Sequence, residues 1–298
     1  MASDAPDVTV VIVTYDAMPW IEQSLESVES YPVVVVDCGS GDDTVGFVRA
    51  RFPAVQLVEV ENRGLGAGWN VGLRSNDSRY TLLLNADAWL VRDALRSLVD
   101  FADRNPRAAI VGPRLLNPDA SLQRSVRGFP TLWRLATEYF FLRKLAPRTR
   151  ALNAFYGGGF GHDRVQDVEV VMGACMLVRR AAVDEVGGLD EDYFLFSEET
   201  DWCYRFHRAG WQVLFYPGAE CVHVRGASHG GRLYRENLRG HLLFFWKHRG
   251  QVRAERARRL LLAGVRLRSV LFRGDRGRAY RDAARWLASG SAAELIAR

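Results

Sequence analysis

The sequence predicts an α/β protein with a mostly parallel central sheet and helices on both of its faces. Short, nearly all-apolar segments recur through the first hundred residues, and segments of helical character separate them. Strands that are covered on both faces are apolar throughout, and their alternation with helices is the pattern of βαβ units. Polar and acidic residues follow the apolar segments, at the strand ends where such sheets bind ligands.

The first part of the chain contains the most regular elements. The expected strands are Val8–Thr14, Val33–Asp37, Val55–Glu59 and Tyr80–Leu84. The expected helices between them are Trp20–Val28, Thr44–Arg51 and Trp69–Arg74.

The order of elements is looser after Val111. A helix is expected over Leu132–Leu145, followed by a flexible glycine-rich loop at Gly157–Gly161. Further on we expect a strand over Val168–Arg179, a helix over Glu199–Ala209 that stops at Gly210, and a strand over Val213–Tyr216.

The charge of the chain is divided unequally between its two ends. Residues 232–298 hold 17 Lys/Arg and 5 Asp/Glu, whereas residues 1–231 hold 23 Lys/Arg and 30 Asp/Glu. An acidic-leaning body is a poor candidate for nucleic-acid binding, and we expect none. A basic extension that contains the apolar run Leu242–Trp246 favours contact with an anionic surface.

The extension also has the spacing of a basic amphipathic helix. Its apolar side is formed by Leu260, Leu267 and Leu271, and its basic residues are Arg259, Arg266, Arg268 and Arg273. Such a helix can lie in a membrane interface, but it can equally pack on the rest of the chain or on a second subunit in a homodimer.

Composition limits the compartment and the redox chemistry. The chain has no uncharged apolar run of about 18 residues, and its first seven residues do not look like a secretory signal. We therefore expect a cytoplasmic protein, peripheral at most on the inner face of the plasma membrane. The four cysteines are far apart, which predicts buried, reduced thiols: Cys38, Cys175, Cys203 and Cys221.

The first candidate site is a carboxylate at the end of a buried strand. The apolar run Leu82–Leu84 leads directly into Asn85, Ala86 and Asp87. An oxygen ligand at Asp87 can hold Mg²⁺ or Mn²⁺, which bridges the two phosphates of a nucleoside diphosphate. An ordinary Asn/Asp turn after a strand explains the same residues.

A second acidic element combines Glu198, Glu199 and Asp201 at the start of a helix. Acidic residues favour helix N-termini, so capping explains part of this cluster. The neighbouring Phe194, Phe196 and Trp202 are not explained in this way. Carboxylates beside aromatic rings have a raised proton affinity, which suits a general base for an acceptor hydroxyl.

Three further features each allow two interpretations. His223, just past a strand, is a structural histidine or a metal ligand. Asp37 can accept from the N3–H of a pyrimidine or cap the following helix as an Asx turn. Glu61–Asn70 lacks the G-x-G-x-x-G spacing of dinucleotide-binding turns. It is either a loop whose backbone and Arg63 approach phosphates or an ordinary glycine-rich turn.

The order of these features resembles family 2 of the inverting glycosyltransferases, which have the GT-A type of nucleotide-sugar fold. The resemblance covers roughly residues 7–230 and rests on D-x-G-S-x-D-x-T from Asp37, E-N-x-G from Glu61, L-N-x-D from Leu84, the acidic segment Phe194–Arg205, and His223. Within that family the chain looks most like bacterial rhamnosyltransferases that act on lipid-linked acceptors, particularly in Val171–Arg180 and Val186–Asp190.

The resemblance implies roles for individual residues. Thr14, Tyr15 and Asp37 would hold the base, Asp87 and His223 would contact the metal or diphosphate, and Glu199 would be the catalytic base. The remaining residues implied in nucleotide-sugar binding are Asn62, Arg63, Gly66, Asn70, Asn85 and Ala86. Asn85 replaces the first Asp of a strict D-x-D motif. Glu199 stands where Asp is more common, so Glu198 and Asp201 remain alternatives for the base.

The expected domains are a GT-A catalytic domain over 1–231, with a nucleotide-sugar half of about 1–115 and an acceptor half of about 116–231, and a helical extension over 232–298. The expected reaction moves a sugar, best matched by rhamnose, from a dTDP- or UDP-linked donor to a hydroxyl of a glycan or lipid-linked acceptor. The alternatives are another sugar (galactofuranose, mannose or glucose) and a non-catalytic module that binds sugar nucleotides.

Overall fold

The computed structural model describes residues 7–224 and 231–297 in two compact units. The first unit comprises the described residues of Met1–Val126, Gly161–Phe194 and Glu198–Ala227. The second comprises Arg127–Phe160, Leu195–Ser197 and the described residues of Ser228–Arg298. The segment Arg127–Phe160, within the expected acceptor half, thus groups with the C-terminal helices.

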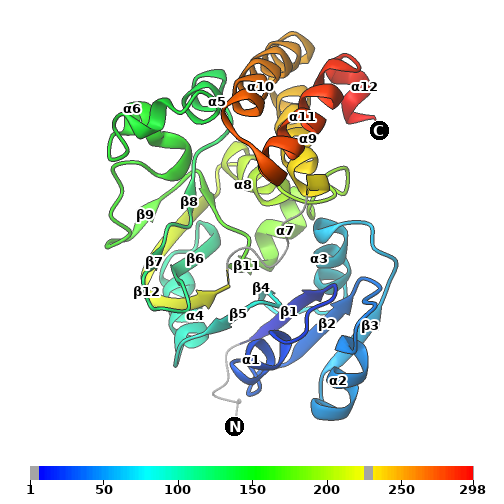
Figure 1. The fold of residues 1–298 in the computed structure, drawn as a ribbon. Helices are drawn as coiled ribbons and strands as arrows, with labels where there is room; N and C mark the ends of the chain where they lie inside the picture. Colours follow the sequence, from blue (N-terminus) through cyan, green and yellow to red (C-terminus); the bar gives the residue numbers. More distant parts are fainter. Residues whose placement is uncertain (1–6, 225–230, 298) are drawn as a thin grey trace. The chain divides into compact units, whose positions relative to one another are not determined.

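A mixed sheet with mostly parallel strands forms the centre of the first unit (Figure 1). Its strand order is β3-β2-β1-β4-β11-β6-β12-β5, with β7 paired to β6 and β9 to β12. Strand β11 runs antiparallel to both of its neighbours. The strands are β1 (Val8–Thr14), β2 (Val33–Asp37), β3 (Gln56–Glu59), β4 (Tyr80–Asn85), β5 (Ala88–Leu90), β6 (Ala108–Leu116), β7 (Leu122–Gln123), β9 (Gln166–Asp167), β11 (Cys175–Arg179) and β12 (Gln212–His223).

Helices lie against this sheet and bury its apolar strands. They are α1 (Ile21–Glu26), α2 (Thr44–Arg51), α3 (Leu65–Arg74), α4 (Ala94–Arg104), α7 (Arg180–Val186) and α8 (Glu198–Arg208). Every residue of β2 is buried, as are all residues of β4 except Asn85. The expected apolar strands of the first part are therefore confirmed to within one residue at either end. All four cysteines are buried and unpaired with one another.

Helix α3 begins four residues earlier than expected, so the glycine-rich segment is helical and the expected loop over Glu61–Asn70 is wrong in its second half. The reason is close packing on β1. A Cβ built on Gly72 would lie 2.1 Å from Val11 Cγ1, and one on Gly68 would lie 2.8 Å from Val13 Cγ1. Glycine lowers helix propensity, but here it lets the helix backbone approach the sheet.

The second half of the first unit differs from expectation in two places. The expected strand Val168–Arg179 is broken into β10 (Val170–Val171), which pairs with β8 (Val126–Arg127) in a separate two-stranded sheet, and β11. Strand β12 continues through Pro217 and Gly218 because a register shift between Tyr216 and Glu220 absorbs them. His223 is consequently the last residue of a strand.

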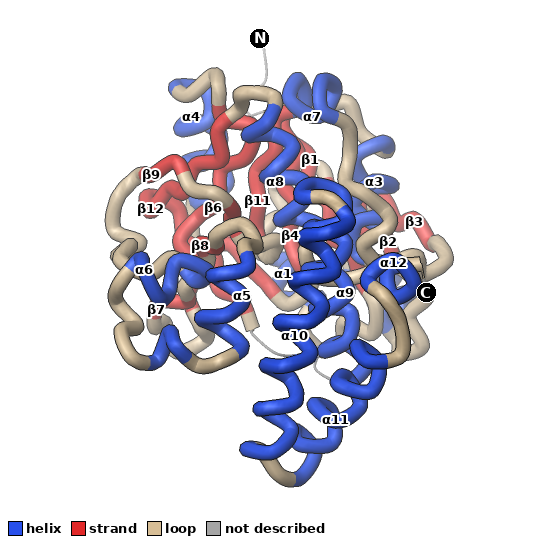
Figure 2. The backbone as a smooth tube through the Cα atoms, turned by 90° about the horizontal axis from the view of Figure 1, so that it is seen from above, coloured by secondary structure: helices blue, strands red, loops and turns tan. Residues whose placement is uncertain are grey.

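The second unit is helical. Its elements are α5 (Leu132–Tyr139), the 3₁₀ turns η1 (Leu142–Lys144) and η2 (Ala154–Tyr156), α6 (Arg150–Asn153), α9 (Gly231–Arg249), α10 (Gln251–Leu271), α11 (Gly274–Ala288) and α12 (Ala292–Ile296). Helix α5 stops before the expected Leu145 because Phe141 adopts a left-handed conformation. Figure 2 shows the antiparallel pair α10–α11, whose joined end extends beyond α9 and α12.

The C-terminal extension buries part of the expected amphipathic surface. Leu260 packs against the core of the second unit, and Arg268 is buried in an ion pair with Glu138, 3.0 Å away. Leu267 and Leu271 are exposed. Leu260 and Arg268 therefore pack within the second unit, as the alternative of a packed helix expects, whereas Leu267 and Leu271 do not. Among the residues that the structure describes, no helix combines the length and apolarity needed to cross a bilayer.

Candidate functional site

Asp37 and Thr14 lie side by side at the carboxyl ends of β2 and β1. The Thr14 hydroxyl donates to Asp37 Oδ1 at 2.8 Å, and the backbone amides of Gly39 and Ser40 donate to Oδ2 at 3.0 and 2.9 Å. Asp37 is only 2% exposed. These bonds have the form of the Asx-turn alternative, so Asp37 shapes the loop after β2. Tyr15, in contrast, projects into solvent and is 58% exposed.

The residues before and within α3 form a contact with the loop that follows α7. The Asn70 amide donates to Leu189 O at 2.8 Å and to Glu191 Oε1 at 3.0 Å, and it accepts from Leu189 N at 2.8 Å. Arg63 pairs with Glu191 at 3.2 Å. Asn70 is thus used in fixing this loop, whereas Arg63 and Asn62 are exposed at the surface. Gly66 is buried in α3.

The structure brings Asp87 and His223 together. Strand β5 pairs antiparallel with β12, with Ala88 opposite His223, and Val224 N donates to Asp87 O at 2.9 Å. His223 Nε2 lies 3.5 Å from Asp87 Oδ1. Both side chains are mostly buried, and burial raises the pKa of Asp87 to about 6.

The two side chains fit a divalent cation. Oxygen and imidazole ligands lie about 2.1 Å from such an ion, so two ligand atoms 3.5 Å apart can share one. Across the described residues, no group of three or more His, Cys, Asp or Glu side chains could hold a metal. A cation at Asp87 and His223 would therefore take its remaining ligands from a donor diphosphate and water.

The three acidic candidates at the start of α8 have different surroundings. Asp201 is fully buried and accepts from Arg205 Nε at 2.7 Å, so its carboxylate has a structural partner. Glu198 is 3% exposed, and burial, followed by the charge of Glu199, raises its pKa well above the usual value. Only Glu199 is partly exposed. The environment thus separates three residues that the sequence left equivalent.

Both acidic elements border the same short segment, Gly173–Ala174. The Asn85 backbone amide, at the end of β4, donates to Ala174 O at 3.0 Å. A Cβ built on Gly173 would lie 3.8 Å from Glu199 Cβ and 2.9 Å from the Trp69 ring. The Leu84–Asp87 motif and Glu199, which are more than a hundred positions apart in the chain, therefore flank one turn before β11.

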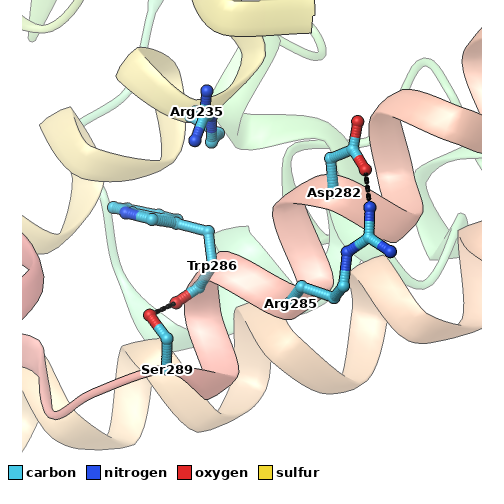
Figure 3. Close-up of a pocket in the computed structure, with 5 residues that line it drawn as sticks. All are labelled: Arg235, Asp282, Arg285, Trp286 and Ser289. Atoms are coloured by element: carbon cyan, nitrogen blue, oxygen red, sulfur yellow. Dashed lines mark hydrogen bonds and ion pairs between the residues drawn. The ribbon is translucent and has the colours of Figure 1, made fainter.

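A surface depression of about 410 Å³ lies elsewhere, in the second unit (Figure 3). It is lined by Arg235 from α9 and by Asp282, Arg285, Trp286 and Ser289 from α11 and its end. Arg285 pairs with Asp282. None of the residues expected in the site lines this depression.

The sequence did not indicate Gln123 or Glu191. Gln123 contacts His223 from a strand a hundred positions away, and Glu191 holds both Asn70 and Arg63. Neither residue belongs to a recognisable spacing. Their roles depend on long-range contacts, which a single sequence does not display.

Comparisons with known proteins show the family and the fold of the chain. Residues 6–241 match the family described as "Glycosyltransferase like family 2". N-acetylglucosaminyl-diphospho-decaprenol L-rhamnosyltransferase of Mycobacterium tuberculosis is 31% identical over 242 residues, covering 74% of this chain and 77% of the relative. Poly-beta-1,6-N-acetyl-D-glucosamine synthase of Staphylococcus aureus is 23% identical, covering 78% of this chain and 53% of that protein.

Two solved structures share the fold. The mannosyltransferase PcManGT from Pyrobaculum calidifontis, in complex with GDP-Man and Mn²⁺, aligns with a TM-score of 0.56 and 16% identity over 99% of this chain and 87% of its own. GalNAc-T7 with UDP, GalNAc and Mn²⁺ aligns with a TM-score of 0.61 and 15% identity over 99% and 58%. The expected GT-A fold is confirmed, and with the family match over most of its length the chain belongs to the glycosyltransferases of family 2.

Proposed function

We propose that this enzyme transfers rhamnose, with inversion, from a nucleoside-diphosphate donor to a hydroxyl of a lipid-linked glycan precursor. The mycobacterial relative, by its name, transfers rhamnose to a diphospho-decaprenol acceptor. The observation that carries the proposal is the approach of two acidic elements, Leu84–Asp87 and Glu199, to the Gly173–Ala174 turn. Leu84–Asp87 faces the donor diphosphate, and Glu199 faces the acceptor.

Donor binding is assigned to the strand ends. Thr14, Tyr15 and the loop that Asp37 holds would surround the base, which we propose is a pyrimidine, as dTDP or UDP. Asn62 and Arg63 are exposed and would meet the phosphates, together with Asn85 and Ala86 beside Asp87. Asn70 and Gly66 would contribute to donor binding indirectly, through the packing of α3.

We assign Mg²⁺ or Mn²⁺ to Asp87 and His223, whose ligand atoms fit a shared ion. Bound there, such an ion neutralises charge on the leaving diphosphate. The chain itself supplies one carboxylate directly before β5 and one imidazole at the end of β12. A donor held there would present its anomeric carbon to the acceptor.

We assign the general base to Glu199. The acceptor hydroxyl must lose its proton as it attacks, and the carboxylate of this partly exposed residue beside the turn can take that proton. Asp201 is committed to Arg205, and Glu198 is buried, where desolvation followed by the charge of Glu199 raises its pKa. Glu199 is the only one of the three with exposed surface.

Isosteric amides test this assignment. Glu199→Gln should lower turnover on the order of 10²- to 10⁴-fold, the usual worth of a general base, while donor affinity stays unchanged. Glu185→Gln makes the same substitution at an exposed glutamate in α7 and controls for the change of charge. Glu198→Gln distinguishes the two neighbours, because a buried glutamate that does not meet the acceptor should lose little turnover when it becomes an amide. Full turnover in Glu199→Gln with loss in Glu198→Gln would move the base to Glu198.

Release of nucleoside diphosphate identifies the donor. We expect release from dTDP- or UDP-rhamnose only when acceptor and Mg²⁺ or Mn²⁺ are present. Faster release from a galactofuranose, mannose or glucose donor would show that the enzyme transfers that sugar instead of rhamnose. If donors bind but no nucleoside diphosphate is released with any acceptor, the protein would be the non-catalytic module that binds sugar nucleotides.

We assign to the second unit the role of binding the membrane that carries the acceptor. Residues 232–298 are strongly basic, and the exposed end of α10–α11 carries both apolar and arginine side chains. We propose a peripheral enzyme on the cytoplasmic face of the membrane rather than a homodimer through these helices. Three exposed apolar side chains among arginines offer far less than the roughly 800 Å² per partner of a stable interface.

A further inference from the structure

We propose that Gln123 is a positioning residue for the cation site. Its side-chain amide holds His223 in the tautomer that carries hydrogen on Nδ1, so that the Nε2 lone pair points toward Asp87. The inference rests on the cation site proposed above and adds a residue outside every motif in the sequence.

The orientation of the Gln123 amide is decided by its two neighbours. Its Nε2 lies 3.0 Å from the backbone carbonyl oxygen of His223 and 2.9 Å from Asn117 Oδ1. A backbone carbonyl can only accept a hydrogen bond, so the Gln123 atom facing it must be the NH₂ group. The other terminal atom of the amide is therefore the oxygen.

The tautomer of His223 follows from this orientation. Gln123 Oε1 lies 2.7 Å from His223 Nδ1, and an amide oxygen can only accept. His223 Nδ1 must therefore carry the hydrogen and donate it. In the neutral ring the lone pair is then on Nε2, the atom that lies 3.5 Å from Asp87 Oδ1.

Burial makes this pair a fixed support. Gln123 is 2% exposed and His223 is 8% exposed, so water does not compete for the two hydrogen bonds between them. Gln123 is itself held in β7, which pairs with β6 through Leu115. One bond from this amide thus orients the ring at Nδ1 and the other holds the His223 backbone before any ligand arrives, as second-shell partners of metal-binding histidines usually do.

The result is an arrangement that favours a positive ligand. An imidazole lone pair and a carboxylate oxygen are both electron-rich, and at 3.5 Å they disfavour each other unless a cation lies between them. Rotating the ring, or moving its hydrogen from Nδ1 to Nε2, would relieve this contact, but Gln123 opposes both changes because its oxygen requires hydrogen on Nδ1. The amide therefore keeps the site ready for a cation.

Two measurements on the full chain test the proposal without any sugar transfer. In the metal-free protein at pH 8, ¹⁵N chemical shifts of His223 should show hydrogen on Nδ1. Gln123→Met, which keeps the length but removes both polar atoms, should abolish this preference and weaken Mn²⁺ binding about 10- to 100-fold. Gln123→Glu keeps an acceptor for Nδ1–H but loses the donor to His223 O and Asn117 Oδ1, so it should keep hydrogen on Nδ1 and bind Mn²⁺ more tightly than Gln123→Met but less tightly than wild type.

Asn117→Ala is the matched control, since it removes the other contact of the Gln123 amide but leaves both bonds to His223. It should keep the wild-type tautomer and bind Mn²⁺ within about twofold of wild type. Melting curves establish that each variant is folded.

Hydrogen on Nε2, or on both nitrogens, in the wild type would overturn the proposal. So would a folded Gln123→Met protein with wild-type Mn²⁺ affinity, or a wild type that does not bind Mn²⁺. Failure of the proposed transfer reaction is a separate outcome, because a protein that transfers no rhamnose can still show the tautomer and the Mn²⁺ response.

Discussion

A buried histidine in the second unit links the stability of this protein to pH. His241 in α9 is 5% exposed, and the rings of Tyr139 and Phe155 meet it edge-on. Burial lowers its pKa to about 4, although the charge of Glu138 opposes the shift. The unfolded chain, with a histidine pKa near 6.5, then binds more protons than the folded chain between these values. Folding stability must therefore fall as pH is lowered from about 6.5 to about 4.

The expected size of this effect is about 3 kcal/mol, from about 1.4 kcal/mol per pKa unit. Urea unfolding at pH 7.5, 5.5 and 4.5 measures it. His241→Leu should lose less of its stability over this range than the wild type does. Equal losses in both proteins would show that His241 is protonated without cost in the folded state.

The site carboxylates show what a sequence can and cannot say about single residues. The sequence predicted that one of Glu198, Glu199 and Asp201 would be a base, because their type and order match a family pattern. The resemblance named Glu199 first but left Glu198 and Asp201 open, since the differences between them arise from burial and from Arg205, four positions after Asp201 in the helix. Gln123 was not predicted at all, because its partner His223 is a hundred residues away.

At the scale of elements, α3 depends on glycine for its contact with β1. A Cβ on Gly72 would lie 2.1 Å from Val11 Cγ1, closer than two carbon atoms can approach. Gly72→Ala should therefore destabilise the protein by about 1–3 kcal/mol, as overpacking of a core does, even though alanine favours helices. Thermal and urea unfolding measure the change.

Two further variants establish the cause. Val11→Ala removes the methyl groups that Gly72→Ala would meet, so the double variant should be more stable than the sum of the two single losses implies. Gly46→Ala in α2 is the control, because its new Cβ meets only the flexible carboxylate of Asp43 at an exposed position. It should leave stability unchanged or raise it by up to about 1 kcal/mol. Additive losses at Gly72 and Val11 would contradict the steric explanation.

Elements were predictable where burial alone decides them. Strands β1, β2 and β4 are covered on both faces and appear in the sequence as apolar runs, so they were found almost to the residue. Helix α3 was shortened in the prediction because its glycines look like a loop until the neighbouring strand is known. Strand β12 was cut at Pro217, since a bulge that absorbs a Pro-Gly pair depends on its partner β6.

At the scale of the whole molecule, charge is segregated along the chain, and the sequence alone showed this. It could not show which basic residues face solvent. Arg268 is buried against Glu138, while Arg266, Arg273 and Arg276 are exposed around the joined end of α10 and α11. Leu267, Val270 and Leu271 are exposed at the same end, at 38%, 81% and 58%. Apolar side chains among arginines are the pattern of a surface that docks on an anionic bilayer.

We predict that this end of the α10–α11 pair, and not basic charge in general, holds the enzyme on membranes. Each arginine near an anionic surface contributes about 1 kcal/mol, so replacing Arg266, Arg273 and Arg276 with serine should lower partition onto phosphatidylglycerol vesicles by about 100-fold. Val270→Asp with Leu271→Asp should lower it further, whereas the arginine replacements should leave binding to neutral phosphatidylcholine vesicles unchanged.

The matched control replaces three exposed arginines in the first half of α10 with serine: Arg253, Arg256 and Arg259. Its net charge equals that of the first triple variant, so long-range attraction to the bilayer is the same in both and only the place of the charges differs. Equal partition of the two variants would mean that the extension acts as a diffuse basic surface. A wild type that is dimeric by sedimentation, and monomeric after Val270→Asp with Leu271→Asp, would mean that a second copy covers this end instead of lipid.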